Sequence, residues 1–206
     1  FNVFSLINGV SLRYVSNTKE LGNPDMIIIP GTKNTIEDLK WLRQSGLEVK
    51  IIRHSKGGKA LFGVCGGYQM LGEVINDPEN AEGGGSIKGL GLLKTITNFS
   101  REKTTRQTTG KINDIDGFYR MLSGLEIKGY EIHMGVSEII DGFPLSKLEV
   151  NQDGCVCANV AGSYVHEIFD NMKGAGAIVK ILADYKGVQI EQTEEFDFAR
   201  FIQKIC

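Results

Sequence analysis

The sequence predicts an α/β fold with a mostly parallel central sheet and helices on both faces. Two continuous apolar runs, 25–30 and 59–64, are typical of parallel strands buried on both sides. Each run leads through a glycine turn into a segment with helical spacing of apolar residues. The chain has 26 glycines and only 4 prolines among 206 residues, which suits short, tight connections. This length favours one domain, 1–206.

The individual elements follow from these patterns. Strands are predicted at 12–15, 25–30, 59–64, 91–97, 108–112, 129–133, 155–158 and 161–166. Helices are predicted between Asn34 and Gly46 and at 47–54, 68–74, 173–185 and 194–206. Asn34 or Thr35 can cap the first of these, with Glu37 completing a capping box after Asn34, and Gly46 can end it. The acidic, glycine-rich stretch 76–91 is expected to be a loop, and the polar stretch 100–107 an exposed loop or hairpin.

Composition excludes several classes of protein. Lys and Arg total 23 against 25 Asp and Glu, and this formal net charge of −2 argues against a nucleic-acid-binding protein that depends on a basic surface. No apolar run is long enough for a transmembrane helix, and the chain does not open like a signal peptide. The cysteines lack the paired C-x-x-C spacing of a zinc site. A reduced, cytoplasmic protein without a membrane partner is expected, in which Cys155, Cys157 and Cys206 only pack.

Cys65 is the candidate nucleophile. It lies in Gly63-Val64-Cys65-Gly66-Gly67, where a strand ends, one residue occupies a sharp turn and a helix begins. Such a nucleophile elbow presents its side chain at the carboxyl end of the sheet, where open α/β folds bind ligands. The amino end of the new helix is expected to favour thiolate and to lower the thiol pKa from about 8.5. A structural cysteine at a strand end is the alternative, which the flanking glycines disfavour.

A cysteine nucleophile needs a base, and the chain has three histidines. His54 lies among charged and polar residues and is expected at an exposed helix end without a catalytic role. His166 ends the run 161–166, far from Cys65 in the sequence, and is the favoured base. His133, within 129–135, is either a group near the substrate or a polar residue satisfied on a strand.

The oxyanion that forms when a thiolate attacks an amide needs N–H donors already in place. The N–H of Gly66, directly after the nucleophile, is one candidate. The turn at Gly31 and Thr32, after the neighbouring strand, is the other. No phosphate-binding G-x-x-x-x-G-K-[ST] loop and no H-E-x-x-H motif occurs, so neither a nucleotide site nor a metal site is expected in this chain.

The motif Gly63-Val64-Cys65-Gly66-Gly67-Tyr68-Gln69 resembles the nucleophile motif of class I, triad-type glutamine amidotransferases. A wider set of motifs is similar to the C-terminal domain of cobyric acid synthase: PGTKNT at 30–35, CGGYQMLG at 65–72, GLGLL at 89–93, GYEIHMG at 129–135 and VHEIFD at 165–170. They run in the family's order over about residues 24–171. The resemblance implies a flavodoxin-like form of the predicted fold, with the domain's first strand missing from this fragment.

The resemblance also implies roles for individual residues. Cys65 would be the nucleophile and His166 its base. The oxyanion and substrate-binding positions would be Gly31, Thr32, Gly66 and Gln69. The wider superfamily has His-x-Glu, but Ile168 stands in place of that glutamate, which implies a Cys–His dyad. Glu167 stands where a glycine is expected. The candidates for orienting His166 or supporting the site are Glu131, His133, Glu167 and Asp170.

The implied function is a glutaminase domain that hydrolyses glutamine to glutamate and ammonia through a cysteine thioester. The ammonia would serve the ATP-dependent amidation of cobyrinic acid a,c-diamide to cobyric acid in cobalamin biosynthesis. ATP and Mg²⁺ would bind to a preceding synthetase domain, the expected partner, so 1–206 is interpreted as an excised domain without a cofactor of its own. The alternatives are the glutaminase subunit of lipid II isoglutaminyl synthase, a cysteine hydrolase of the related protease or chaperone type, and a catalytically degenerate docking domain.

Overall fold

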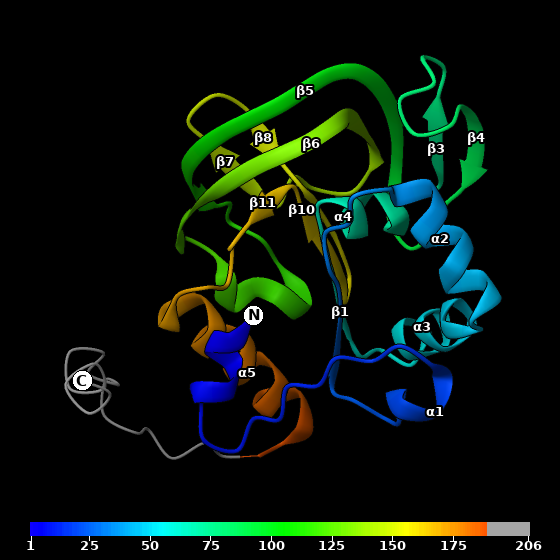
Figure 1. Cartoon of the computed structure of the whole chain (residues 1–206). Coiled ribbons are helices and arrows are strands. Elements are labelled where there is room, and N and C mark those ends of the chain that lie inside the picture. The colour runs from blue at the N-terminus through cyan, green and yellow to red at the C-terminus, as the bar shows by residue number, and fades with distance from the viewer. Residues whose placement is uncertain (189–206) are drawn as a thin grey trace, which may run out of the picture.

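The computed structural model describes residues 1–188 (Figure 1). The elements in chain order are η1 (Asn2–Leu6), α1 (Thr18–Leu21), β1 (Met26–Ile29), α2 (Thr35–Gln44), α3 (Leu47–Lys56), β2 (Ala60–Val64), α4 (Gly66–Leu71), β3 (Val74–Asp77), β4 (Gly85–Lys88), β5 (Lys94–Ile112), η2 (Gly117–Leu122), β6 (Glu126–Asp141), β7 (Ser146–Leu148), β8 (Gln152–Asp153), β9 (Cys155–Cys157), β10 (Val160–Ser163), β11 (Val165–His166) and α5 (Met172–Lys186). The predicted helix at 194–206, with Cys206, lies outside the described residues. No helix in this part of the chain combines the length and apolarity needed to cross a membrane.

A four-stranded sheet forms the centre of the molecule, with the strand order β1-β2-β10-β9. β1, β2 and β10 are parallel, and β9 is antiparallel at one edge. The parallel strands end at one level, because Ile29 pairs with Gly63 and Ser163 pairs with Val64. The turns that follow them therefore meet at one edge of the sheet, which brings Gly31, Cys65 and His166 together.

Helices cover both faces of this sheet, as predicted (Figure 1). On one face, Phe62 and Val64 of β2 pack with residues of α5, η1 and η2, including Ile178, Phe4 and Tyr119. On the other face, Leu61 packs with residues of α2, α3 and α4, including Leu39, Ile51 and Leu71. All of β2 is buried, so burial on both sides explains its continuous apolar sequence.

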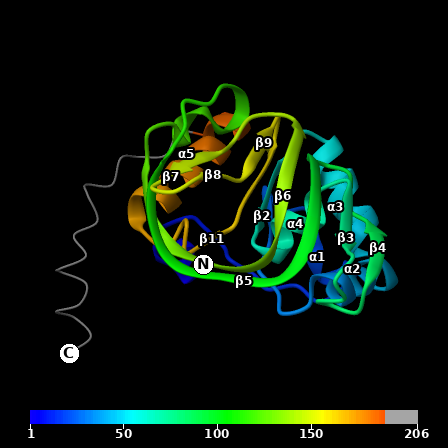
Figure 2. The ribbon, with the colours of Figure 1, turned by 90° about the horizontal axis from the view of Figure 1, so that it is seen from above.

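A second, largely antiparallel sheet stands over the carboxyl edge of the first. Its main strands, β5 and β6, form one long curved ribbon along one side of the molecule (Figure 2). β5 includes the stretch 100–107, so the prediction of a loop or hairpin there was wrong. The stretch lacks the polar–apolar alternation typical of a strand, because its inward-facing residues are also polar. One of them, Arg106, lies opposite Glu131 on β6 and forms an ion pair with it.

Other local predictions also need correction. Segment 12–15 is not a strand, and Arg13 instead donates to carbonyls at the end of α1. The helix predicted at 68–74 ends at Leu71, and 76–91 contains β4 and the second half of β3. His54 is buried and bonds to the Ala60 carbonyl at 2.9 Å instead of lying exposed. Cys155 is buried as expected, whereas Cys157 is exposed.

The helices that cover the sheet were predicted well. α2, α3 and α5 occur within a few residues of the predicted bounds. Asn34 caps α2, where its side chain accepts from the Glu37 N–H at 2.9 Å. Gly46 follows α2 with φ +76°, a left-handed conformation that favours glycine.

The close packing of α4 on β1 gives a test of the fold. A Cβ atom at Gly67 would collide with the Ile29 carbonyl oxygen and lie 2.8 Å from that of Pro30. We expect Gly67→Ala to lower the free energy of unfolding by at least about 2 kcal/mol, because backbone atoms must move. Gly176→Ala is the matched control, since nothing lies within 4 Å of its Cβ position in α5; it should raise stability by about 0.5–1 kcal/mol. Thermal unfolding measures both, and equal stabilities would contradict this packing.

Candidate active site

Cys65 occupies the predicted sharp turn between β2 and α4. Its φ of 50° and ψ of −112° lie outside the regions that L-residues favour. The neighbouring backbone holds this conformation: the Cys65 N–H donates to the Ser163 carbonyl at 2.8 Å, and its carbonyl accepts from the Gln69 N–H at 3.0 Å. The predicted elbow is confirmed in its backbone. Its side chain, however, is only 5% exposed.

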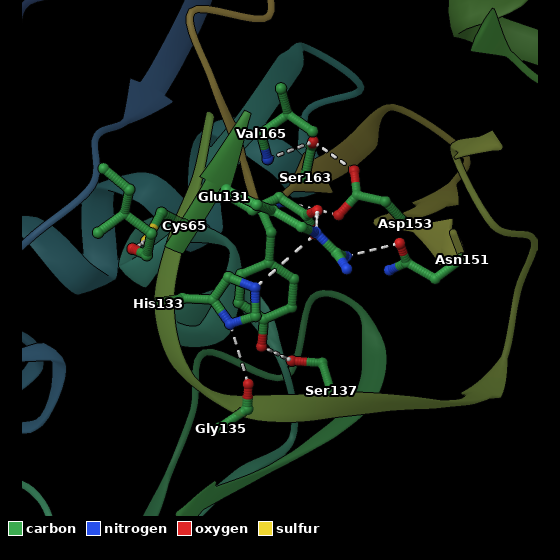
Figure 3. Close-up of polar contacts among 12 residues, drawn as sticks. Cys65, Glu131, His133, Gly135, Ser137, Asn151, Asp153, Ser163 and Val165 are labelled. Carbon is green, nitrogen blue, oxygen red and sulfur yellow. Dashed lines mark hydrogen bonds and ion pairs between the residues drawn. The ribbon is translucent and has the colours of Figure 1, made fainter. Parts of the chain in front are cut away.

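Strand β6 covers the thiol, as Figure 3 shows from the position of Cys65 beside that strand. The Cys65 Sγ donates to the Ile132 carbonyl at 3.3 Å, and the Gln69 Nε2 donates to the Met134 carbonyl at 2.9 Å. The two donors and the two acceptors are spaced alike. Cys65 and Gln69 are four residues apart, which in a helix is a rise of about 6 Å, and Ile132 and Met134 are two residues apart, which in a strand is about 6.6 Å. β11 pairs with β6 only at Tyr130 and Glu131, so the edge beyond them is open to α4.

Burial determines the protonation of Cys65 and His166. It raises the pKa of the Cys65 thiol to about 11, although a hydrogen bond from the Gly66 N–H acts in the opposite direction. The expected lowering of this pKa was therefore wrong. Burial also lowers the pKa of His166, as does nearby His133, while Glu167 and the Ile132 carbonyl oppose the shift. At neutral pH the site holds a neutral thiol and a neutral imidazole.

Gly31 lies between these two groups. A Cβ atom on Gly31 would lie 2.8 Å from the His166 Cε1 and 3.4 Å from the Cys65 Cβ. The glycine therefore leaves room between nucleophile and imidazole that a side chain would fill. His166 and Gly31 also line a cavity of about 340 Å³, together with Val64, Ile132 and others. This volume is in the range of small-ligand pockets, about 300–1,000 Å³.

The two predicted oxyanion turns are adjacent. Gly66 is the first residue of α4, so its N–H has no partner within the helix. The backbone nitrogen of Thr32 lies 3.3 Å from the position of a Cβ on Gly66. The Thr32 hydroxyl donates to Asp38, so the backbone of Thr32, and not its side chain, is available to a ligand.

Gln69 is engaged entirely by the protein. Its Oε1 accepts from the Thr35 hydroxyl at 3.0 Å, and its Nε2 donates to the Met134 carbonyl and to the Tyr164 hydroxyl at 3.2 Å. The residue is only 2% exposed. These bonds fix β6 against α4, which sequence reasoning missed; the proximity of Gln69 to substrate stays a prediction.

Buried Glu131 and the largely buried His133 lie close together on β6 (Figure 3). Glu131 pairs with Arg106 and lies 3.8 Å from the His133 Nε2. Burial alone would raise the Glu131 pKa, but the nearby His133 ring and the Arg106 guanidinium lower it to about 2. The His133 ring stacks on Tyr164 at 3.8 Å between centroids, and Tyr164 bonds to Gln69. Through Tyr164, the cluster therefore helps to hold β6 in place against α4.

None of the predicted orienting groups makes a direct hydrogen bond to His166. Glu131 is committed to Arg106, and Asp170 pairs with the amino group of Phe1 at 3.2 Å. Glu167 is exposed and has φ +65°, a left-handed conformation that explains why a glycine was expected there. Ile168 is buried in the apolar core. Within residues 1–188 the His166 Nε2 has no hydrogen-bond partner.

Asp153 was missed by sequence reasoning, because a lone aspartate in a polar stretch gives no signal. It is 3% exposed and accepts from the Ser163 hydroxyl at 2.5 Å and the Tyr164 N–H at 2.9 Å. These bonds shape the bend between β10 and β11 that places His166. In the part of the chain that the structure describes, no group of three or more His, Cys, Asp and Glu could hold a metal ion.

The protonated thiol gives a pH test. We expect the alkylation rate of Cys65 by iodoacetamide, measured in a Cys157→Ala background and corrected with Cys65→Ala, to rise about tenfold per pH unit from pH 7 to about 10. The reason is that the thiolate fraction grows in this way below a pKa of about 11. A rate that is already constant between pH 6 and 8 would instead indicate a preformed thiolate–imidazolium pair.

Comparisons with known proteins agree with this geometry. Residues 1–174 match the family of CobB/CobQ-like glutamine amidotransferase domains. The cobyric acid synthase of Ruminiclostridium cellulolyticum is 44% identical over 213 residues, which cover 99% of this chain and 41% of that protein. That of Lachnoclostridium phytofermentans is 43% identical, with 93% and 40% covered. This chain thus spans about two fifths of the length of these relatives.

Solved structures confirm the predicted fold class. The structure of PurLQS from Thermotoga maritima has a TM-score of 0.63 and 16% identity, with 90% of each chain covered. A crystal structure of a glutamine amidotransferase has a TM-score of 0.58 and 18% identity, with 87% of this chain and 88% of that one covered. The elbow at Cys65, the adjacent His166 and the family match lead to one conclusion: this chain belongs to the CobB/CobQ-like glutamine amidotransferase domain family.

Proposed function

We propose that this chain is the glutaminase domain of a cobyric acid synthase, which hydrolyses glutamine through a Cys65 thioester and supplies ammonia. The observation that carries the proposal is the placement of both Cys65 and His166 beside Gly31, where Gly31 and His166 line a ligand-sized cavity. The ammonia would amidate cobyrinic acid a,c-diamide to cobyric acid. The relatives' names support this reaction over the lipid II alternative.

The amidation itself would belong to the part of a longer protein that this chain does not include. The relatives are more than twice as long as the matched segment, which leaves room for an ATP-dependent synthetase that binds ATP, Mg²⁺ and the corrinoid. A cytoplasmic location is part of the proposal, because the reaction needs both glutamine and ATP.

The first half of the reaction follows from the neutral thiol–imidazole pair. The thiol leaves the Ile132 carbonyl and turns to His166, which accepts its proton as Sγ attacks the carboxamide carbon of glutamine. The new oxyanion accepts from the N–H of Gly66 and from the Gly31–Thr32 turn. Donors of this kind are each worth about 10²–10³ in rate, because they face the charge only as it develops.

The second half releases the two products. The imidazolium of His166 protonates the departing nitrogen, the C–N bond breaks, and ammonia leaves with the γ-glutamyl group bound to sulfur as a thioester. Neutral His166 then takes a proton from water as the water attacks the thioester. Collapse of this second oxyanion returns the proton to sulfur and releases glutamate.

Substitution of the nucleophile tests the assignment. We expect Cys65→Ala to abolish glutamine hydrolysis and labelling by a glutamine analogue that carries a diazoketone, because the substitution removes the sulfur that forms the thioester. Exposed Cys157→Ala is the matched control and should leave both unchanged. Glutamate release and the mass of the labelled peptide are the measurements.

Two results would contradict the proposal. Normal glutamine hydrolysis by Cys65→Ala would remove the assigned nucleophile. Absence of both hydrolysis and labelling in the wild-type full-length protein would instead favour the degenerate docking domain.

A further inference from the structure

The outer face of β6 carries a row of exposed apolar side chains. Tyr130, Ile132, Val136 and Ile140, called here the β6 stripe, are 38%, 41%, 64% and 61% exposed. They occupy even-numbered positions of the strand, and the more buried residues between them, such as Glu131, point to its opposite face. The β5 residues opposite the first three are polar: Gln107, Thr105 and Asn98. Exposed Glu138 interrupts this row between Val136 and Ile140. Exposed apolar side chains that line up beside a cavity are typical of an interaction site.

We propose that the β6 stripe is the docking surface for an apolar face of the ATP-dependent synthetase part of the same protein. This inference rests on the proposed function and names the partner surface for it. More than half of each relative lies outside the matched segment, 59% in the Ruminiclostridium cellulolyticum enzyme, whose matched share is 41%. That remainder must receive ammonia from this domain, so its contact belongs close to Cys65.

The stripe begins at the wall of the catalytic cavity. Tyr130 and Ile132 line the cavity that also contains His166. A partner seated on these side chains would cover the mouth of the cavity. Ammonia released at His166 would then pass into the partner, and not into bulk water, where protonation would remove its nucleophilic lone pair.

The same strand holds the thiol. The Ile132 side chain is part of the stripe, and its carbonyl accepts from the Cys65 Sγ. The β5–β6 register shifts between Asn98 and Lys103, and Gly135 has φ +79°, so the ladder is irregular directly beside this contact. A partner that displaces β6 would therefore also free the thiol for His166, which couples docking to glutamine hydrolysis.

The amino end of the chain lies at the same place. Phe1 lines the cavity together with Tyr130 and Ile132. A polypeptide joined to Phe1 in a longer protein would therefore leave the domain beside the β6 stripe, and it could cover the stripe without crossing the domain.

The test uses the full-length protein with Val136→Lys and Ile140→Lys combined, at the end of the stripe away from the cavity. We expect glutamine-dependent amidation to fall at least tenfold, while amidation with added ammonium salt stays within twofold of wild type. Val49→Lys on α3, where the wild-type side chain is 59% exposed, is the matched control and should change neither rate. Ile140→Glu alone is a second variant. It should also lower glutamine-dependent amidation and leave ammonium-dependent amidation unchanged.

Three results are informative beyond this expectation. Glutamine-dependent amidation within twofold of the Val49→Lys control would overturn the docking surface. A dimer of the wild-type protein that dissociates in the stripe variant, with amidation intact, would overturn the synthetase as the occupant in favour of a second copy. Failure of the wild-type protein to amidate with either glutamine or ammonium would contradict the proposed function itself. This result differs from a failure of the docking surface, which affects only the stripe variants.

Discussion

Two carbonyl groups of β6 accept hydrogen bonds from the side chains of Cys65, at the start of α4, and Gln69, within it, and the geometry of the site depends on this contact. Cys65 and Gln69 are one helical turn apart, and Ile132 and Met134 are two strand residues apart, so both bonds form in one register. The contact buries the thiol, which keeps it protonated. It also places the Ile132 carbonyl next to both Cys65 and His166. The resting site is thus closed, and substrate must compete with the strand for the sulfur.

A buried polar network gives β6 its position. It runs from Arg106 through Glu131 and His133 to Tyr164 and ends at Gln69. Buried ion pairs contribute little net stability, because desolvation offsets their attraction, but they fix a specific arrangement of the groups they join. Here the arrangement that they fix is the distance between β6 and the nucleophile turn. The cluster therefore acts on the reaction through the position of β6 and makes no direct hydrogen bond to the His166 ring.

The sequence predicted the features whose causes are local. Continuous apolar runs identified β1 and β2. The glycines around Cys65 identified the turn, because neighbouring atoms pack so closely against them that a Cβ atom would clash. What it could not predict depends on residues distant in the chain. The helix-end argument gave the wrong direction for the thiol pKa, because the strand that buries the thiol lies 67 residues away. Likewise, 100–107 is polar on its inner face because it pairs with the Glu131 cluster.

The most direct test of this account is a crystal structure of the chain with a glutamine analogue bound covalently to Cys65. The account requires the acyl oxygen to accept from the Gly66 N–H and from the Gly31–Thr32 turn, with a ring nitrogen of His166 in hydrogen-bond reach of the reacting centre. It also requires the Ile132 carbonyl to have moved away from the sulfur. An acyl group that points away from Gly66, with β6 unmoved and His166 out of reach even through a bridging water, would contradict it.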